Sequence, residues 1–152
     1  MLYRPFLFSL IGLLLASCTD GMVLHCYKPL PKGGWERCDT VYFDVPQQSK
    51  DIDGTLFIGL RTKSQLGFRD IVLAVEQCLD APAAYKCDTI CYPLTDAEGN
   101  ALTGGVNNHQ FETLHLPLRL KKGQSGTIRI HHLMTHEVIF GITEIGIKLF
   151  TP

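Results

Sequence analysis

The sequence predicts an all-β protein, a β-sandwich of seven or eight mostly antiparallel strands over residues 35–152. Apolar and polar residues alternate at period two in several separate stretches, which is typical of half-buried strands. No window of ten or more residues beyond the first eighteen has a helical period with caps. Without helices to cover a single sheet, the apolar faces of the strands have to pack against each other.

The alternation assigns the strands in order along the chain. One-sided apolar sets occur at Val41, Phe43 and Val45; at Leu56, Ile58 and Leu60; at Leu114, Leu116, Leu118 and Leu120; at Ile128 and Ile130; and at Ile145, Ile147 and Leu149. Residues 70–77 are apolar on both faces, which indicates a central strand that is covered on both sides. Gly99 and Asn100 are suited to positive φ, so a tight hairpin is expected between Leu94 and Leu102.

Length and composition fit one compact domain. The chain has 152 residues, of which 45% are hydrophobic and 19% are charged. A domain of this size buries enough surface to fold without help, so we expect no cofactor and no metal. The 14 Lys and Arg residues against 15 Asp and Glu give a formal net charge of -1. This leaves no basic excess for a phosphate backbone, and no nucleic-acid partner is expected.

The first eighteen residues predict export. A charged start at Arg4 is followed by an apolar run over Pro5–Ala16, and small residues precede Cys18. The run is too short to anchor the protein by spanning a bilayer, which takes about 20 apolar residues. Residues 1–17 are therefore interpreted as a signal peptide.

The cleavage region also predicts a lipid anchor. Leu15-Ala16-Ser17-Cys18 resembles the lipobox of bacterial lipoproteins, which implies that Cys18 becomes an N-terminus acylated on its sulfur and amine. Two or three acyl chains, at about 0.8 kcal/mol per buried CH₂, make an essentially permanent attachment to the membrane. Thr19, in place of an Asp directly after the lipidated Cys, favours the outer membrane over the inner membrane.

Residues 18–34 are expected to form this lipidated N-terminus and a tether. At most one short strand is predicted there, around Val23–Tyr27, because Pro29, Pro31 and the Gly33-Gly34 pair oppose regular structure. Such a tether would hold the domain tens of ångströms from the lipid.

Five cysteines follow Cys18, so at most two disulfides can form in an export compartment. Cys87 and Cys91 are about 13 Å apart in a strand, too far to pair with each other. Cys78 with Cys87 and Cys26 with Cys38 are the preferred pairs, because each brackets a turn-forming connection; fifteen two-bridge arrangements remain open. No C-x-x-C pair supports a zinc site.

The chemistry of an enzyme is not apparent in the sequence. No Ser lies in a Gly-x-Ser-x-Gly elbow, and no phosphate-binding Gly loop is present. His131, His132, His136 and nearby Glu137 form one polar group that could bind a metal. Alternation places His132 inward and His131 outward, which favours a hydrogen-bonded core histidine and two surface histidines over a metal site.

Several residues in order resemble the GldH-type gliding-motility lipoproteins, over most of the chain from about Trp35 to Leu149. They are Gly34-Trp35; Phe43 in Asp39-Thr40-Val41-Tyr42-Phe43; Arg61 at the end of Leu56–Arg61; Asp88-Thr89; and the closing Gly141-Ile142-Thr143-Glu144-Ile145-Gly146-Ile147. The resemblance implies a non-enzymatic outer-membrane lipoprotein that is linked to a gliding and secretion machinery, with other envelope proteins as partners. Gly146, opposite the apolar face of its strand, predicts a bulge or a close approach.

Two hypotheses of function follow. The first is this assembly component of an envelope machinery, which would bind its partners through an apolar or aromatic patch. The second is a surface or periplasmic module that binds a glycan or another ligand. Such a module would expose aromatic rings such as Trp35, Tyr42, Tyr85 or Phe111 as stacking platforms.

Overall fold

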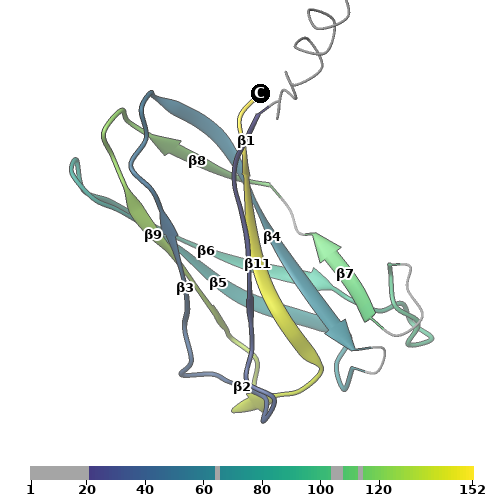
Figure 1. Cartoon of the computed structure of the whole chain (residues 1–152). Helices are drawn as coiled ribbons and strands as arrows, with labels where there is room; N and C mark the ends of the chain where they lie inside the picture. Colours follow the sequence, from purple (N-terminus) through teal and green to yellow (C-terminus); the bar gives the residue numbers. More distant parts are fainter. Residues whose placement is uncertain (1–20, 64–65, 104–107, 113–114) are drawn as a thin grey trace, which may run out of the picture.

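The protein consists of two antiparallel sheets that pack face to face, as the computed structural model in Figure 1 shows. The structure describes residues 21–63, 66–103, 108–112 and 115–152. These residues form no helix. They contain eleven strands: β1 (Met22–Pro29), β2 (Trp35–Glu36), β3 (Val41–Val45), β4 (Ile52–Lys63), β5 (Asp70–Leu79), β6 (Ala84–Pro93), β7 (Asn108–Glu112), β8 (Leu116–Leu120), β9 (Gly126–His132), β10 (Val138–Ile139) and β11 (Ile142–Phe150). The predicted all-β sandwich is confirmed.

The larger sheet is organised around the long strand β4. Its strand order is β1-β11-β4-β7, and β8 also pairs with β4. The first half of β4, Ile52–Leu56, pairs with β8, and the second half, Gly59–Lys63, pairs with β7. One strand of 12 residues therefore holds two short strands in line along one of its edges.

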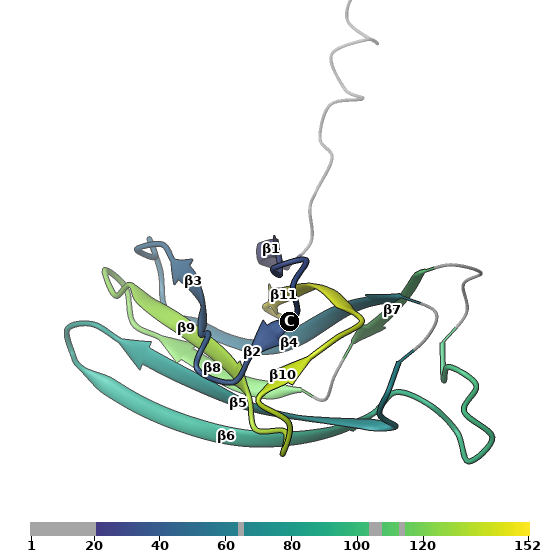
Figure 2. The ribbon, with the colours of Figure 1, turned by 90° about the horizontal axis from the view of Figure 1, so that it is seen from below.

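The smaller sheet has the order β3-β9-β5-β6. Seen along the sandwich in Figure 2, β5 and β6 lie in the layer opposite β1, β11, β4 and β7. A separate two-stranded ribbon of β2 and β10 lies at the end of the molecule remote from the C-terminus (Figure 1).

The core lies between the two sheets and follows the predicted alternation. Leu56, Ile58 and Leu60 from β4 are fully buried, as are Ile128 and Ile130 from β9. Their neighbours in sequence point to the outer faces, because side chains alternate along a strand. The largest other core side chains are Trp35, Phe43, Ile71, Leu73, Leu94, Leu118 and Leu120.

Some elements differ from the prediction. β7 was not foreseen, and Leu114, expected to begin a strand, lies outside the described residues. β5 does lie between two other strands, but only one of its faces is in the core: Val72 and Glu76 on the other face are partly exposed. The run of apolar residues in β5 therefore reflects a strand inside a sheet, and no second layer covers its outer side.

The predicted hairpin after Leu94 is present. Thr95 and Ala101 form an isolated bridge, and Asp96 N–H donates to Asn100 O at 2.9 Å. Gly99 has a φ of 87°, a left-handed conformation in which glycine avoids the strain of a Cβ atom. Asn100 has no positive φ; its side-chain amide instead donates to the Asp96 carboxylate at 3.0 Å.

Much of the segment that was expected to be a tether, residues 18–34, is a strand of the sandwich in the structure. β1 begins at Met22 and pairs with β11 from Met22 to Pro29, so this segment is an edge strand of the larger sheet. Leu24 and Cys26 face inward and pack against the core. The prolines do not prevent this strand from forming, because Pro29 is its last residue and Pro31 lies beyond it. The sandwich therefore extends to Met22, beyond the predicted boundary at residue 35.

Trp35 and His132 close one end of the core. Trp35 is 1% exposed and His132 is fully buried. His132 Nε2–H donates to the carbonyl of Trp35 at 3.0 Å, and its Nδ1 accepts from Met134 N–H at 3.3 Å. The two rings also make an edge contact, with centroids 5.2 Å apart. The predicted hydrogen-bonded core histidine is confirmed, and its two bonds fix the neutral tautomer.

These contacts predict that stability depends on pH through His132. Burial lowers the pKa of His132 below its usual value of 6.5, because the charged ring would lose its hydration. The unfolded chain binds this proton below about pH 6.5, while the folded protein resists it. The free energy of unfolding should therefore be at its full value above about pH 6.5 and should fall at lower pH, by at most about 1.4 kcal/mol per pH unit.

Denaturant titration of the wild type and of His132→Gln at about pH 7.5 and about pH 5.5 measures this effect. Gln does not titrate, so the loss on acidification should be smaller in the variant, although its stability at the higher pH is lower. The other five histidines are common to both proteins and cancel in the comparison. An equal loss in the two proteins would contradict the assignment to His132.

Candidate functional site

The outer face of the larger sheet carries a cluster around one tyrosine, which we call the tyrosine cluster: Tyr27, Gly59, Arg61, Glu144 and Gly146. The register places Tyr27 of β1 opposite Gly146 of β11, and Gly146 opposite Gly59 of β4. The Tyr27 ring lies across both glycines: a Cβ atom built at Gly146 would be 2.6 Å from the ring atom Cγ, and one built at Gly59 would be 2.7 Å from Cζ. Only glycine leaves room for the ring at these positions.

Charged side chains surround this ring. The guanidinium carbon of Arg61 lies 4.2 Å from the ring centroid, so the cation stacks on the face of the tyrosine. Arg61 Nη1 also donates to Glu144 Oε2 at 2.6 Å, and Lys148 of β11 pairs with Glu112 of β7 across the intervening strand β4. The Arg61 and Glu144 side chains are 41% and 34% exposed, so this ion pair can be reached from solvent.

The tyrosine cluster offers no activated group for a reaction among the described residues. Burial raises the pKa of the Tyr27 phenol, which stays protonated at neutral pH. Its hydroxyl is buried and has no hydrogen-bond partner among the described residues. Arg61 is neutralised by Glu144. Ion pairs of this exposure contribute about 0–1 kcal/mol to stability, so the pair does little to hold the fold together.

The sequence identified only part of this cluster. Arg61, Glu144 and Gly146 belong to the stretches that carry the resemblance described above, and the predicted close approach at Gly146 is present. Tyr27 was not predicted to take part. An isolated glycine within the apolar pattern of β4, Gly59, is the signal that could have indicated a second close approach.

The five described cysteines are free thiols, so neither of the two predicted disulfides is present in the structure. Cys78 lies opposite Tyr85 and Cys87 lies opposite Glu76, so these two thiols are offset by two residues along the hairpin and are not directly opposite each other. Cys26 lies in the middle of β1, opposite Ile147, whereas Cys38 lies in the turn after β2.

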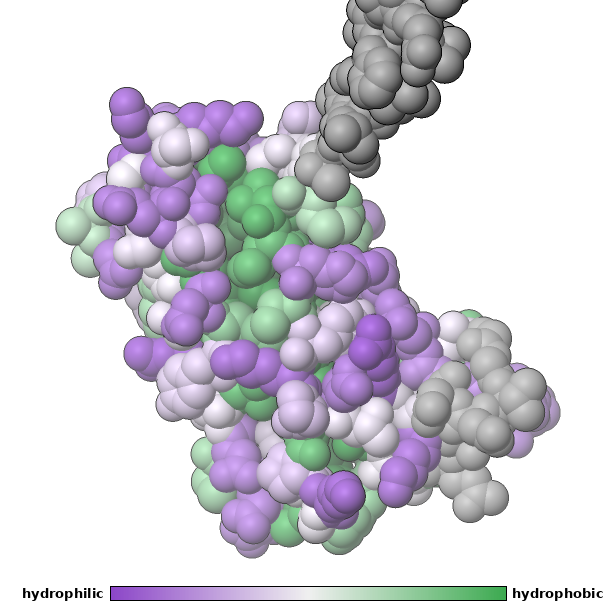
Figure 3. Space-filling view, in the orientation of Figure 1, coloured by the Kyte–Doolittle hydropathy of each residue, from purple (hydrophilic) through white to green (hydrophobic). Residues whose placement is uncertain are grey.

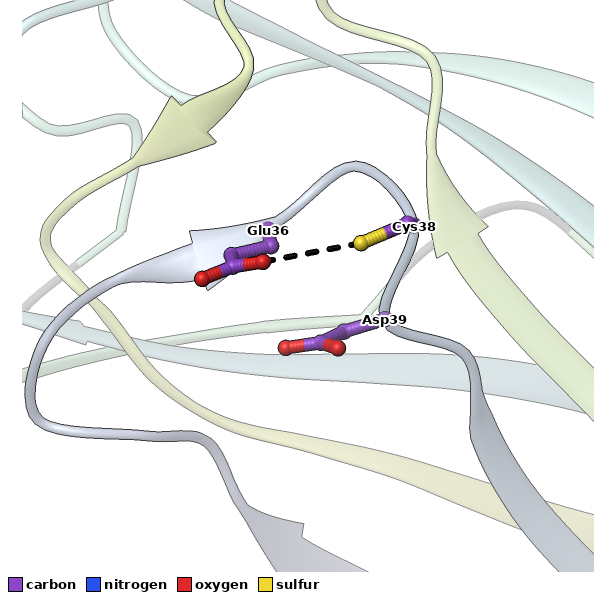
Figure 4. Close-up of side chains that lie close together, drawn as sticks. All are labelled: Glu36, Cys38 and Asp39. Carbon is purple, nitrogen blue, oxygen red and sulfur yellow. Dashed lines mark hydrogen bonds between the residues drawn. The ribbon is translucent and has the colours of Figure 1, made fainter.

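Glu36, Cys38 and Asp39 place their ligand atoms close together, as Figure 4 shows. All three side chains are exposed. The Cys38 thiol donates a hydrogen bond to Glu36 Oε2 at 3.5 Å, and this bond raises the pKa of the thiol. Cys38 therefore stays protonated at neutral pH, and a metal ion would have to displace this proton to bind the thiolate.

The three histidines that lie close together in the sequence, His131, His132 and His136, point in different directions in the structure. His132 points into the core, while His131 lies on the outer face with its Nδ1 atom 3.9 Å from Glu76 Oε1. His136 is exposed in the connection before β10. Adjacent residues on a strand point to opposite faces, which is why His131 and His132 do not converge on one ion.

The aromatic residues considered as stacking platforms divide into two groups. Trp35 and Phe111 are buried, at 1% and 3% exposure, and cannot contact a ligand. Tyr42 and Tyr85 are 51% and 67% exposed and lie on the outer face of the smaller sheet, on its two edge strands. Three strand spacings, about 14 Å, separate these two edges.

A strip of apolar surface runs along the open side of the sandwich between β1 and β3, shown as green atoms in Figure 3. Partly buried Val23, Leu24 and Cys26 from β1 and Val41 from β3 pack at the margin of the core here. The two edge strands do not pair with each other, so the core is incompletely covered along this line.

The predicted lipidation site Cys18 lies outside the described residues. The first described residue, Gly21, is held in place at the end of the larger sheet, because Thr151 N–H donates to Gly21 O at 2.7 Å. Among the described residues, no helix is long and apolar enough to cross a membrane.

Comparison with known proteins gives two consistent similarities. The model of a family described as GldH lipoprotein matches residues 22–149, which include every described strand except the last residue of β11. The gliding motility lipoprotein GldH of Flavobacterium johnsoniae is 24% identical over 148 residues, covering 92% of this chain and 91% of the relative.

Proposed function

Because the chain belongs to the GldH lipoprotein family, we propose that it is a lipid-anchored, non-enzymatic component of a gliding-motility and secretion machinery in the cell envelope. The family match over residues 22–149 is the observation that carries this proposal. Cys18 would hold the acyl chains, the outer membrane would be the site of attachment, and other envelope proteins would be the partners.

The surface of the sandwich supports a role in assembly. Phe140 is 63% exposed at the turn between β10 and β11, and the apolar strip lies along β1 and β3. Exposed apolar patches of this kind are typical of protein contact sites. The alternative of a glycan-binding module has weaker support, since two of its four candidate platforms are in the core and only Tyr42 and Tyr85 remain available.

Affinity purification from the native host tests the proposal. A tag inserted in the exposed turn around Glu98 keeps both ends of the chain free. We expect the wild type to fractionate with the outer membrane and to enrich gliding or secretion proteins over an unrelated lipoprotein that carries the same tag. Cys18→Ser should lose the acyl chains, the membrane fraction and this enrichment together.

Two results would contradict the proposal. Detection of an acylated N-terminal peptide of Cys18→Ser by mass spectrometry would exclude Cys18 as the anchor. Alternatively, the wild type could enrich no envelope machinery while it binds an envelope polysaccharide in a manner abolished by Tyr85→Ala, which would support the glycan-binding alternative.

A further inference from the structure

One end of the sandwich brings the start of the described chain together with two connecting loops. Met22 of β1 pairs with Phe150 of β11, which pairs with Thr55 near the start of β4. Ile52, the first residue of β4, pairs with Leu120, the last residue of β8. The loop over residues 46–51 enters β4 and the loop over residues 121–125 leaves β8, so both lie at this end (Figure 1). We call it the anchor-proximal end.

The distance between this end and the proposed acyl chains is limited by covalent geometry. Only Thr19 and Asp20 separate Cys18 from Gly21 in the sequence. Three residue steps span at most about 11 Å, even when fully extended. Gly21 is itself held by Thr151, whose backbone N–H and hydroxyl both donate to the Gly21 carbonyl, at 2.7 Å and 3.3 Å. An anchor at Cys18 would therefore leave no long flexible tether between the lipid and the fold.

Hydrogen bonds join the loops over residues 46–51 and 121–125 into one surface, which we call the platform. Gly123 N–H donates to Gln48 O at 2.8 Å, and Gln48 N–H donates to Gln124 O at 3.2 Å. The Gln47 side chain donates to Gly123 O at 2.8 Å. Gln124 is 3% exposed, and its amide donates to Pro82 O at 2.6 Å, which joins the platform to the β5–β6 connection. These bonds keep the loops in position at the end of the sandwich.

The platform presents lysines with free ammonium groups. Asp51 accepts from Lys122 N–H at 2.8 Å and from the Lys121 ammonium at 3.3 Å, and Asp80 accepts from the Ser125 hydroxyl at 2.6 Å. Within the described residues, the ammonium groups of Lys50 and Lys122 have no ion-pair partner. The carboxylates of the platform are thus hydrogen-bonded within the protein, while two cations remain available to an anionic group outside it.

An exposed methionine and a group of aromatic rings lie on the strands that lead to this end. Met22 is 44% exposed. Phe57 makes edge contacts with Phe150 and with His115, with centroids 5.8 Å and 4.8 Å apart, on the outer face of the larger sheet. Lysines and aromatic rings together suit the boundary between lipid headgroups and water, where the ammonium groups can contact anionic phosphates.

We infer that the anchor-proximal end rests on phospholipid headgroups, with Lys50 and Lys122 contacting lipid phosphates and Lys121 lying beside them at the surface, so that the sandwich stands upright on the membrane. This inference rests on the proposed lipidation of Cys18. It places the β2–β10 end, with exposed Phe140, at the side remote from the bilayer, where a protein partner can reach it.

Lysine labelling of the full-length, lipidated protein tests this orientation. The protein is bound to vesicles of phosphatidylethanolamine and phosphatidylglycerol, treated briefly with a membrane-impermeant succinimidyl ester, and digested for mass spectrometry. Lys32 and Lys63, which line a pocket beside Phe140 at the opposite end, are exposed internal references. A matched variant carries a ten-residue Gly-Ser linker between Asp20 and Gly21, which adds up to about 33 Å of reach.

We expect Lys50, Lys121 and Lys122 to react at least fivefold more slowly than in the linker variant, while Lys32 and Lys63 react equally in both proteins. Protection of the three lysines in both proteins would also support the contact, with the lysines themselves drawing the end to the surface. Equal reactivity at the two ends of an acylated protein would overturn the inference alone. Absence of the acylated Cys18 peptide from the same digest would overturn the proposed lipidation and this inference together.

Discussion

Replacing Trp35 by Ala should lower the free energy of unfolding by about 3–5 kcal/mol, the range for removing a large aromatic side chain from a core. Trp35 is 1% exposed, its indole N–H donates to Asp39 O at 2.9 Å, and its ring contacts His132. Its removal leaves a cavity at the end of the sandwich and leaves the carbonyl of Asp39 without this donor. The β2–β10 ribbon, which pairs through only two residues on each strand, should then detach most readily.

Two further variants separate the contribution of the buried ring from that of the indole hydrogen bond and from that of an exposed ring. Trp35→Phe keeps most of the ring but not the indole N–H, so it should be markedly less destabilised than Trp35→Ala. Tyr85→Ala removes an aromatic ring that is 67% exposed and should stay within about 0.5 kcal/mol of the wild type. Trp35 is the only tryptophan, so unfolding has to be followed by far-UV circular dichroism and not by tryptophan fluorescence. A loss below about 1 kcal/mol for Trp35→Ala would contradict its role in the core.

The second large effect is expected at Gly146. A Cβ atom at this position would approach the Tyr27 ring to 2.6 Å, which is shorter than real carbon contacts allow. Gly146→Ala must therefore displace the ring, at a loss of about 1–3 kcal/mol that is typical of overpacking, and Gly146→Val should lose more. Because Tyr27 belongs to the edge strand β1, its displacement should also loosen the strand that joins the sandwich to the proposed anchor.

A double-mutant cycle identifies the contact that causes this loss. In a Tyr27→Ala background the ring is absent, so Gly146→Ala should be tolerated much better, with a coupling energy of about 1–3 kcal/mol. Gly67→Ala is the matched control, because no atom lies within 4 Å of a Cβ built there and its φ is not positive. Denaturant midpoints of the four cycle members give the coupling directly. Additive losses would show that Gly146 is needed for a reason other than the Tyr27 ring.

The two effects concern two separate contacts of the fold. Trp35 and His132 close the end that our inference places away from the membrane, and Tyr27 fastens the strand that leads to Cys18. A protein that is unfolded or degraded cannot bind an envelope partner, whichever of the two contacts is lost. Destabilisation at either position should therefore reduce co-purification of envelope proteins, even though neither Trp35 nor Tyr27 would contact a partner itself.

Local sequence determined much of this protein. Period-two alternation was enough to predict the sandwich, because the apolar positions within each strand show which side chains face the core. The same parity placed His132 inward and His131 outward, and Gly99 indicated the hairpin turn. The sequence also indicated the lipoprotein family, through the order of Trp35, Arg61 and the stretch from Gly141 to Ile147. The alternation, the histidine parity and the hairpin turn depend on residues close together in the chain.

The tertiary structure decided what depends on pairing between distant segments. Residues 22–29 are a strand and not a tether because β11, more than 110 residues later, supplies their hydrogen-bond partners. The same register brings Tyr27 over Gly146 and Gly59, and places Arg61 against Glu144. Alternation tells which face a side chain occupies, but not which strand lies beside it, since the same pattern is compatible with many strand orders. The length of the link to the proposed anchor, on which the inferred orientation on the membrane depends, could be derived only from the observed strand order.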